Sequence, residues 1–339
     1  MIEVKNLVKD YGGRMAVDHL SFTVEDGQIY GFLGPNGAGK STTMNIMTGY
    51  LGATEGKVLF DGHDILEEPE EAKKCIGYLP ELPPLYMDMT VREYLDFASK
   101  LKKLPKTGRG AAIAEVMELV KITDVQGRLI RNLSKGYRQR VGMAQAILGS
   151  PSVIILDEPT VGLDPKQIIE IRDMIKGLGK KHTVILSSHI LSEVNAVCDH
   201  IMIIAKGKLI ASDTPENLEL QMAKAAGLEL DVKGAEEDIQ RALSSIPGIS
   251  LSSIKTGSEE STCHVSLQLA GPETADDSTD VRETLFYALA QNRLPILSMT
   301  TSKASLEDIF LELTEDTEDG TPGRNISQKA EPEKEAAAL

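Results

Sequence analysis

The spacing of hydrophobic positions changes along this chain and predicts which elements form. Up to residue 60, short apolar runs alternate with glycine turns, which is typical of strands. Between about 82 and 132 the apolar residues follow a helical period, and the helix after Thr90 begins with the capping pattern Thr90-x-x-Glu93. This part predicts a helical arm. The strands predicted before the arm are residues 2–7, 21–24, 29–33 and 57–60.

Helix and strand patterns alternate from residue 135 to 212. The runs at 153–156 and 183–186 are continuously apolar or β-branched, as in strands buried on both faces. Asp164-Pro165 places an N-cap and a first-turn proline at the start of a helix. This alternation predicts an α/β fold with a mainly parallel sheet.

A second, smaller unit is predicted to begin near residue 227. Its pattern gives the order βαββαβ, the ferredoxin-like α+β arrangement. A final helix at 305–313 carries apolar residues at helical spacing. Three regions result: a first domain over 1–220, a regulatory or dimerising domain over 227–313, and a disordered acidic tail over 315–339.

Composition excludes several classes of function. The 339 residues include 36 basic and 51 acidic side chains, for a formal net charge of −15, which argues against nucleic acid as the main ligand. The three cysteines are far apart and are expected to be reduced. We expect neither a signal peptide nor a membrane helix, so that any membrane-spanning part would come from another chain.

A glycine-rich loop provides the first candidate chemistry. Gly34, Pro35, Asn36, Gly37, Ala38, Gly39, Lys40, Ser41 and Thr42 fit the pattern Gly-x-x-x-x-Gly-Lys-[Ser/Thr] between a buried strand and a helix. Glycines let the backbone turn with positive φ and direct N–H groups at phosphate oxygens. Lys40 would reach the β- and γ-phosphates, and the Ser41 hydroxyl would bind Mg²⁺. The loop predicts a nucleotide site.

Two acids follow the buried strand at 153–156. Asp157 is placed to hold the Mg²⁺ shell, as in P-loop enzymes, and Glu158 to orient or deprotonate the attacking water. Alone, such a pair could equally be two solvated acids; the nearby phosphate loop favours the catalytic interpretation.

Ser134 and Gly136 lie at the start of a further predicted helix. A serine N-cap with unobstructed N–H groups forms an anion site, although in isolation it is an ordinary capped helix. Because the phosphate loop has its own helix N-terminus, this second one is better explained as binding another nucleotide across a dimer.

Together these motifs resemble, over residues 1 to about 220, the nucleotide-binding subunit of an ABC transporter. The resemblance rests on six motifs that follow one another along the chain, at residues 34–42, 77–81, 133–139, 153–158 and 162–164 and at His189. The chain is most similar to exporter subunits that pair with separate permeases, of the drug-resistance, sodium-efflux and gliding-motility types.

The resemblance implies further roles. Tyr11 would stack on adenine, His189 would hydrogen-bond the γ-phosphate, and Asp164 would contact the opposite subunit. Glu81 stands where glutamine is usual and remains a candidate Mg²⁺ ligand, with an added negative charge. Lys135 and Tyr137 replace the commonest glycine and glutamine of the signature motif.

The resulting hypothesis is an ATP-hydrolysing subunit of a membrane exporter. Two copies, or a pseudo-dimer, would close around two ATP–Mg²⁺ and drive a polytopic permease from the cytoplasmic side of the membrane. The alternatives are a soluble ABC-type switch in DNA repair or translation, and a GTPase or small-molecule kinase. The sequence lacks the inserts, tandem cassettes or guanine motif that those classes use.

Overall fold

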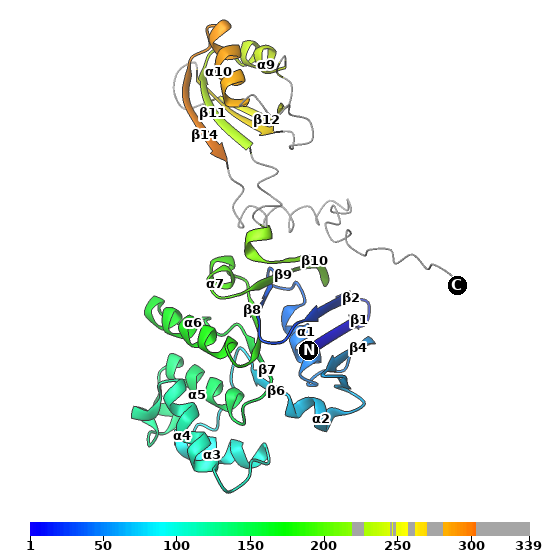
Figure 1. Ribbon diagram of the computed structural model, residues 1–339, viewed down its shortest axis with the longest axis vertical. Helices are drawn as coiled ribbons and strands as arrows, with labels where there is room; N and C mark the ends of the chain where they lie inside the picture. The colour runs from blue at the N-terminus through cyan, green and yellow to red at the C-terminus, as the bar shows by residue number, and fades with distance from the viewer. Residues whose placement is uncertain (219–226, 245, 247–248, 257–261, 270–280, 303–339) are drawn as a thin grey trace, which may run out of the picture. The chain divides into compact units, whose positions relative to one another are not determined.

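The computed structural model describes residues 1–218, 227–244, 246, 249–256, 262–269 and 281–302 (Figure 1). The chain divides into two compact units, the first within Met1–Pro215 and the second beginning at Glu216. The helix predicted at 305–313, with Leu306, Ile309, Phe310 and Leu313, and the predicted tail lie outside the described residues.

The first unit begins with an antiparallel sheet. Its strands are β1 (Ile2–Asp10), β2 (Met15–Val24), β4 (Glu55–Phe60) and β5 (His63–Asp64), in the order β2-β1-β4-β5. The first two strands are longer than predicted because register shifts carry the pairing past polar residues. Phe22 from this sheet packs against Phe32 of the second sheet, with ring centroids 5.5 Å apart.

The second sheet of this unit is the scaffold for the nucleotide motifs. Five strands are parallel: β3 (Ile29–Leu33), β6 (Ile76–Leu79), β7 (Val153–Asp157), β8 (Thr183–Ser188) and β9 (His200–Ala205). Strand β10 (Lys208–Asp213) is antiparallel, and the order is β10-β9-β3-β8-β7-β6. All residues of β3, β7 and β8 are buried, as predicted for the apolar runs. Because these strands are neighbours, their carboxyl ends meet at one edge.

Some helices of the first unit lie beside this sheet, and others form the arm (Figure 1). The arm contains α3 (Val91–Leu101) and α4 (Arg109–Leu119), and α3 begins with the predicted capping box of Thr90 and Glu93. The other helices of the unit are α1 (Lys40–Met47), α2 (Pro69–Lys74), α5 (Lys135–Ile147), α6 (Pro165–Gly179) and α7 (Leu191–Asn195).

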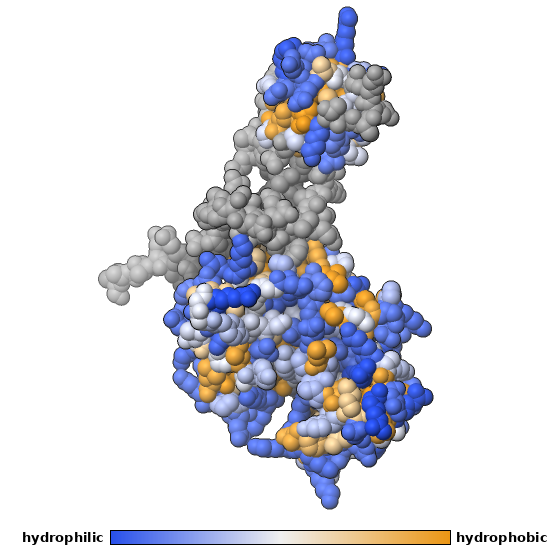
Figure 2. Space-filling model, turned by 180° about the vertical axis from the view of Figure 1, so that it is seen from behind, coloured by the Kyte–Doolittle hydropathy of each residue, from blue (hydrophilic) through white to orange (hydrophobic). Residues whose placement is uncertain are grey.

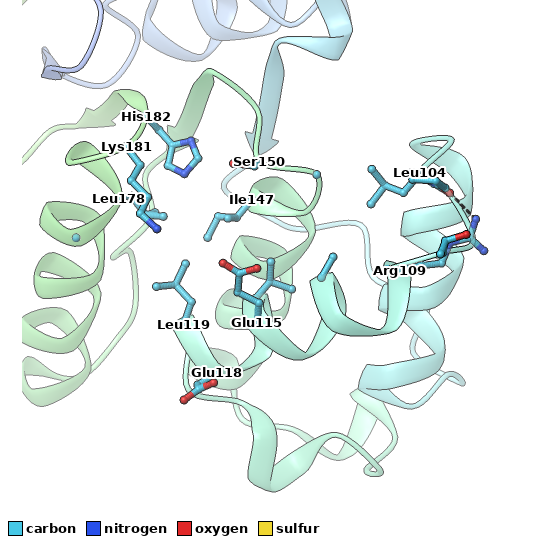
Figure 3. Close-up of a pocket in the computed structure, with 17 residues that line it drawn as sticks. Leu104, Arg109, Glu115, Glu118, Leu119, Ile147, Ser150, Leu178, Lys181 and His182 are labelled. Carbon is cyan, nitrogen blue, oxygen red and sulfur yellow. Dashed lines mark hydrogen bonds between the residues drawn. The ribbon is translucent and has the colours of Figure 1, made fainter.

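A cavity of about 590 Å³ lies where the arm meets α5 and α6. Leu119, Ile147 and Leu178 converge on it in Figure 3, with Glu115 and Lys181 beside them. Ser150 and His182 also line it, and they lie shortly before the starts of β7 and β8. The cavity therefore lies at the amino ends of these strands, away from the edge that carries the nucleotide motifs.

The second unit has the predicted element order. It contains β11 (Gly227–Lys233), α9 (Glu236–Leu243), β12 (Ile249–Thr256), β13 (Thr262–Leu269), α10 (Val281–Gln291) and β14 (Ile296–Ser302). The antiparallel order β12-β13-β11-β14 is that of a ferredoxin-like sheet. Leu230 and Val265 are fully buried in its core, while His264 pairs on the other face with Asp231.

The surface is polar over most of the face shown in Figure 2, with apolar patches separated by hydrophilic residues. Among the residues that the structure describes, no helix has both the length and the apolar character needed to cross a membrane.

Candidate nucleotide-binding site

The phosphate loop joins the end of β3 to the start of α1. Gly37 and Gly39 have φ of 83° and 105°, so the predicted positive φ is found at these two positions. Gly34 is not among the residues with positive φ, and a different constraint, the space around it, requires glycine there. A Cβ there would lie 2.3 Å from the carbonyl oxygen of Ile204, so the neighbouring backbone leaves no room for a side chain.

Lys40 is the first residue of α1 and is buried. Its Nζ donates to the carbonyl oxygens of Gly34 and Pro35, at 2.8 and 3.2 Å, which holds the ammonium across the loop. Burial lowers the pKa of Lys40, while the carboxylates of Glu158 and Asp157 oppose this shift. The lysine is thereby positioned beside the space that the loop encloses.

Asp157 lies beneath the loop at the end of β7. The Ser41 hydroxyl donates to its carboxylate over 3.4 Å, and the Ser187 hydroxyl donates to the same oxygen over 2.5 Å. Sequence reasoning missed Ser187. The parallel pairing of β7 with β8 places Ser187 directly opposite Asp157, and no motif in the sequence marks this register.

Glu158 follows in an unusual backbone conformation, with φ of 47°. Its backbone N–H donates to the Ser187 hydroxyl at 2.9 Å, and its buried carboxylate lies 3.0 Å from His189 Nδ1 and 3.7 Å from Lys40 Nζ. Backbone strain of this kind is concentrated at functional sites. A carboxylate is thus held between a lysine and a histidine at the mouth of the phosphate loop.

These groups open into a cleft of about 560 Å³. Its lining includes predicted residues from distant parts of the chain, namely Tyr11, Asn36, Gly37, Gly39, Lys40, Ser41, Thr42, Glu81, Glu158 and His189. Tyr11, the residue predicted to stack on adenine, is 53% exposed at this cleft. Arg14, Met15, Ala16 and Val161 also line the cleft and were missed, since no motif marks them.

The other predicted residues do not line this cleft. Gly34 and Pro35 support Lys40, Ala38 is buried, and Asp157 lies under Ser41. Ser134 caps α5 by accepting from the Tyr137 N–H at 3.4 Å, and Gly136 is buried beside Gln167. The start of α5 is therefore a second capped helix N-terminus, separate from the cleft of its own chain.

Known proteins are similar to this chain in sequence. The sequence pattern of the ABC transporter family matches residues 17–161. The chain is 46% identical over 213 residues to the uncharacterised ABC transporter ATP-binding protein YhcH of Bacillus subtilis, covering 62% of this chain and 68% of that protein. It is 32% identical to the linearmycin resistance ATP-binding protein LnrL of the same organism, and the match covers 93% of this chain and 98% of that protein. This chain is an ABC transporter ATP-binding protein.

A solved relative supports the same assignment in three dimensions. The dimeric bacterial ABC transporter cassette MJ0796 superposes with a TM-score of 0.58 at 25% identity, over 63% of this chain and 98% of that one. The first unit is an ABC cassette, and the ABC protein binds and hydrolyses ATP as a transport subunit. Of the functions considered from sequence, the soluble ABC-type switch is not favoured.

Proposed function

We propose that two copies of this ABC protein, or one copy and a close relative, close head-to-tail around two ATP–Mg²⁺ and so power export through a separate permease. One chain would provide the cleft with Lys40 and Glu158. The other would provide the capped start of α5, Ser134–Gly136. ATP acts here as a ligand that favours the closed state, and hydrolysis reopens it.

The observation that carries the proposal is the separation of two helix N-termini, the start of α1 and the start of α5. The cleft already has the N-terminus of α1, while α5 presents a second capped N-terminus that does not line it. A head-to-tail pair would bring each α5 to its partner's γ-phosphate. The dimeric state of the related cassette fits this arrangement.

Within the cleft each polar group has a distinct role. Ser41 and Asp157, 3.4 Å apart, would bind Mg²⁺ with the phosphates, since Mg²⁺ prefers few carboxylates and keeps several waters. Glu81 at the cleft edge would add an oxygen. Glu158 would orient the attacking water, and His189 would contact the γ-phosphate while holding the Glu158 carboxylate. Tyr11 would stack on adenine.

Contact with the permease is proposed at the segment between Glu81 and α3. Leu82, Tyr86 and Met87 are large apolar residues that are 76%, 55% and 40% exposed. The Tyr86 ring packs edge-on against Phe97 of α3, with centroids 5.3 Å apart, so the segment links the cleft to the arm. The site of action would be the cytoplasmic side of the membrane.

The cargo class is proposed from the relative matched over nearly its full length. Because that protein is a linearmycin resistance ATP-binding protein, we infer that this chain serves export of an antibiotic-like compound.

Ser134→Asp tests the head-to-tail arrangement. Aspartate caps helices as well as serine does, so α5 should remain intact, but its charge would repel a partner's γ-phosphate. In a Glu158→Gln background, we expect this variant to bind ATP as a monomer and to fail to form the ATP-dependent dimer, measured by light scattering.

Ser134→Asn is the matched control, since it caps without charge and should retain the dimer. A dimer of undiminished stability in the aspartate variant would refute the assigned role of α5.

A further inference from the structure

The cavity beside the arm has walls that take no part in the nucleotide cleft. It lies between α4 of the arm and the C-terminal ends of α5 and α6, and its volume is about 590 Å³. Pockets that bind small organic molecules have volumes of about 300 to 1,000 Å³, so this cavity is large enough for such a ligand. Leu119 on its wall is 43% exposed, which leaves apolar surface for a ligand to cover.

Gly177 is a wall residue that the cavity itself explains. It lies inside α6, where glycine is the least favourable residue after proline. Its φ is not positive, and an added Cβ would meet no atom within 4 Å. Neither the backbone conformation nor a close neighbour therefore requires glycine at this position. Its effect is to leave the space beside α6 unfilled.

His182 presents a buried polar group to this space. The residue is 7% exposed and lines the cavity (Figure 3). Its Nδ1 lies 2.7 Å from the carbonyl oxygen of Pro151, which can only accept, so Nδ1 carries the hydrogen. In the neutral ring Nε2 is then an acceptor, and none of the described residues is hydrogen-bonded to it. A ligand would therefore have to bring a donor to His182.

The arm contributes two carboxylates to the wall. Glu115 and Glu118 lie three residues apart on α4 and so share one face of that helix. Within the described part of the chain, neither forms an ion pair. Figure 3 shows the Glu115 carboxylate directed toward Leu119 and Ile147, so an anionic acceptor adjoins the apolar surface.

Two basic residues also line the cavity, but each has another environment for its charge. Lys181 is exposed, and its flexible stem lets the ammonium turn to water. Arg109 donates from Nη2 to the carbonyl oxygen of Leu104 at 2.6 Å, which holds it at the end of the cavity near Leu104 (Figure 3). The polar groups left for a ligand are therefore mainly acceptors.

We propose that this cavity binds a small amphipathic amine, an organic molecule with an apolar body and one protonated amino group. The apolar body would cover Leu119, Ile147 and Leu178. The ammonium would donate to the Glu115 carboxylate, and an N–H or O–H elsewhere on the ligand would donate to His182 Nε2. A ligand with a carboxylate in place of the amine would meet Glu115 as a like charge. The proposal does not depend on the head-to-tail dimer.

Such a ligand would touch the arm and the core of the first unit at once, since α4 belongs to the arm and α6 does not. It would favour the arrangement of α4 against α6 in which both walls are in reach. Amide hydrogen exchange in the facing parts of these helices should therefore slow when the ligand binds.

The test uses the full-length chain and two fluorescent probes, with ADP–Mg²⁺ present to fill the nucleotide cleft. Dansylcadaverine has an apolar ring system, a sulfonamide N–H and a five-carbon chain that ends in a primary amine. In 6-(dansylamino)hexanoate the same ring and chain end in a carboxylate. We expect the amine to bind saturably, with a rise in fluorescence, and the carboxylate to bind roughly tenfold more weakly or worse, because a charge-assisted hydrogen bond is lost.

Three variants locate the probe. Glu115→Gln should weaken amine binding by roughly tenfold and remove most of the preference over the carboxylate. Asp173→Asn is the matched control, since Asp173 is an exposed carboxylate of α6 that does not line the cavity, and it should bind as the wild type does. Gly177→Leu should abolish binding while α6 stays folded, because leucine favours a helix and its side chain fills the open space.

Each result bears on a separate part of the proposal. Equal affinity for the two probes, or for the amine in Glu115→Gln and the wild type, would overturn the choice of an amine. Undiminished binding to Gly177→Leu, or no slowing of exchange in α4 and α6 of the wild type, would place the probe elsewhere and overturn the site. Failure of the ATP-dependent dimer would leave all of these measurements unchanged and would affect the proposed function alone.

Discussion

Glu158 is the residue on which the most independent constraints converge. Its φ of 47° costs free energy for any residue with a Cβ, and such a conformation persists only where the surroundings fix it. Here Ser187 binds the Glu158 N–H, and His189 and Lys40 bracket its carboxylate. The strain directs the carboxylate into the cleft rather than along the strand.

Replacing Glu158 with glutamine should separate binding from hydrolysis. The amide keeps the size of the side chain but cannot take a proton, so we expect ATP to bind and steady-state turnover to fall by roughly 10²-fold or more. Glu193→Gln is the control, since Glu193 is a buried carboxylate nearby that does not line the cleft. If turnover fell equally in the two variants, the role of Glu158 would be structural and not catalytic.

At the scale of elements, the arm is joined to α5 by a lysine. Lys102, the C-cap residue of α3, donates from Nζ to the carbonyl oxygens of Ala146 and Leu148, at 3.0 and 2.8 Å. These are among the carbonyls that a helix leaves unpaired at its C-terminus. The arm therefore holds the end of α5 opposite to Ser134.

This contact predicts a pH dependence of stability. Lys102 is exposed as a whole residue, but its ammonium end is partly buried against these carbonyls, and this burial lowers its pKa from 10.5 to about 8. Between these pH values the unfolded chain therefore binds the proton that the folded chain has released. The contribution of Lys102 to the free energy of unfolding should therefore rise with pH from about 8 to 10.5.

Urea unfolding of Lys102→Met against wild type across that range measures the effect. The wild type should gain stability relative to the variant as pH rises. Lys103→Met controls for charge, because the Lys103 side chain is 79% exposed. A parallel pH profile for the Lys102 variant and the wild type would contradict the prediction.

At the scale of the whole molecule, the proposed site residues all lie in the first unit. The second unit is proposed to regulate or dimerise: its strands alternate apolar and polar residues and pack one face against its helices. Its buried apolar residues form a core of their own. Among the described residues, all those that line the nucleotide cleft belong to the first unit.

A chain ending at residue 226 should keep ATP affinity close to wild type but lose stability of the ATP-dependent dimer or coupling to the permease. Nucleotide titration and dimer mass would be measured on a truncated chain shown to be folded by circular dichroism. Loss of ATP binding in that folded chain would place part of the site in the second unit. An unchanged dimer and unchanged coupling would remove its regulatory role.

The sequence alone determined the elements and the local chemistry of this ABC protein. The apolar runs at β7 and β8, the capping box at Thr90 and the turn at Gly39 depend on periodicity, hydrogen-bonding groups and φ, which are properties of a few adjacent residues. The motif order was likewise sufficient to predict the family that the comparisons establish.

Tertiary structure decided what those residues touch. Ser187 reaches Asp157 only because β8 pairs with β7, and Gly34 is glycine because Ile204 passes close to it. Arg14 and Val161 enter the cleft without any motif, and Lys135 reaches Gly162 across a gap of 27 positions that includes a helix and a strand. Such contacts depend on how strands and helices pack, and packing joins residues whose separation along the chain carries no local signal.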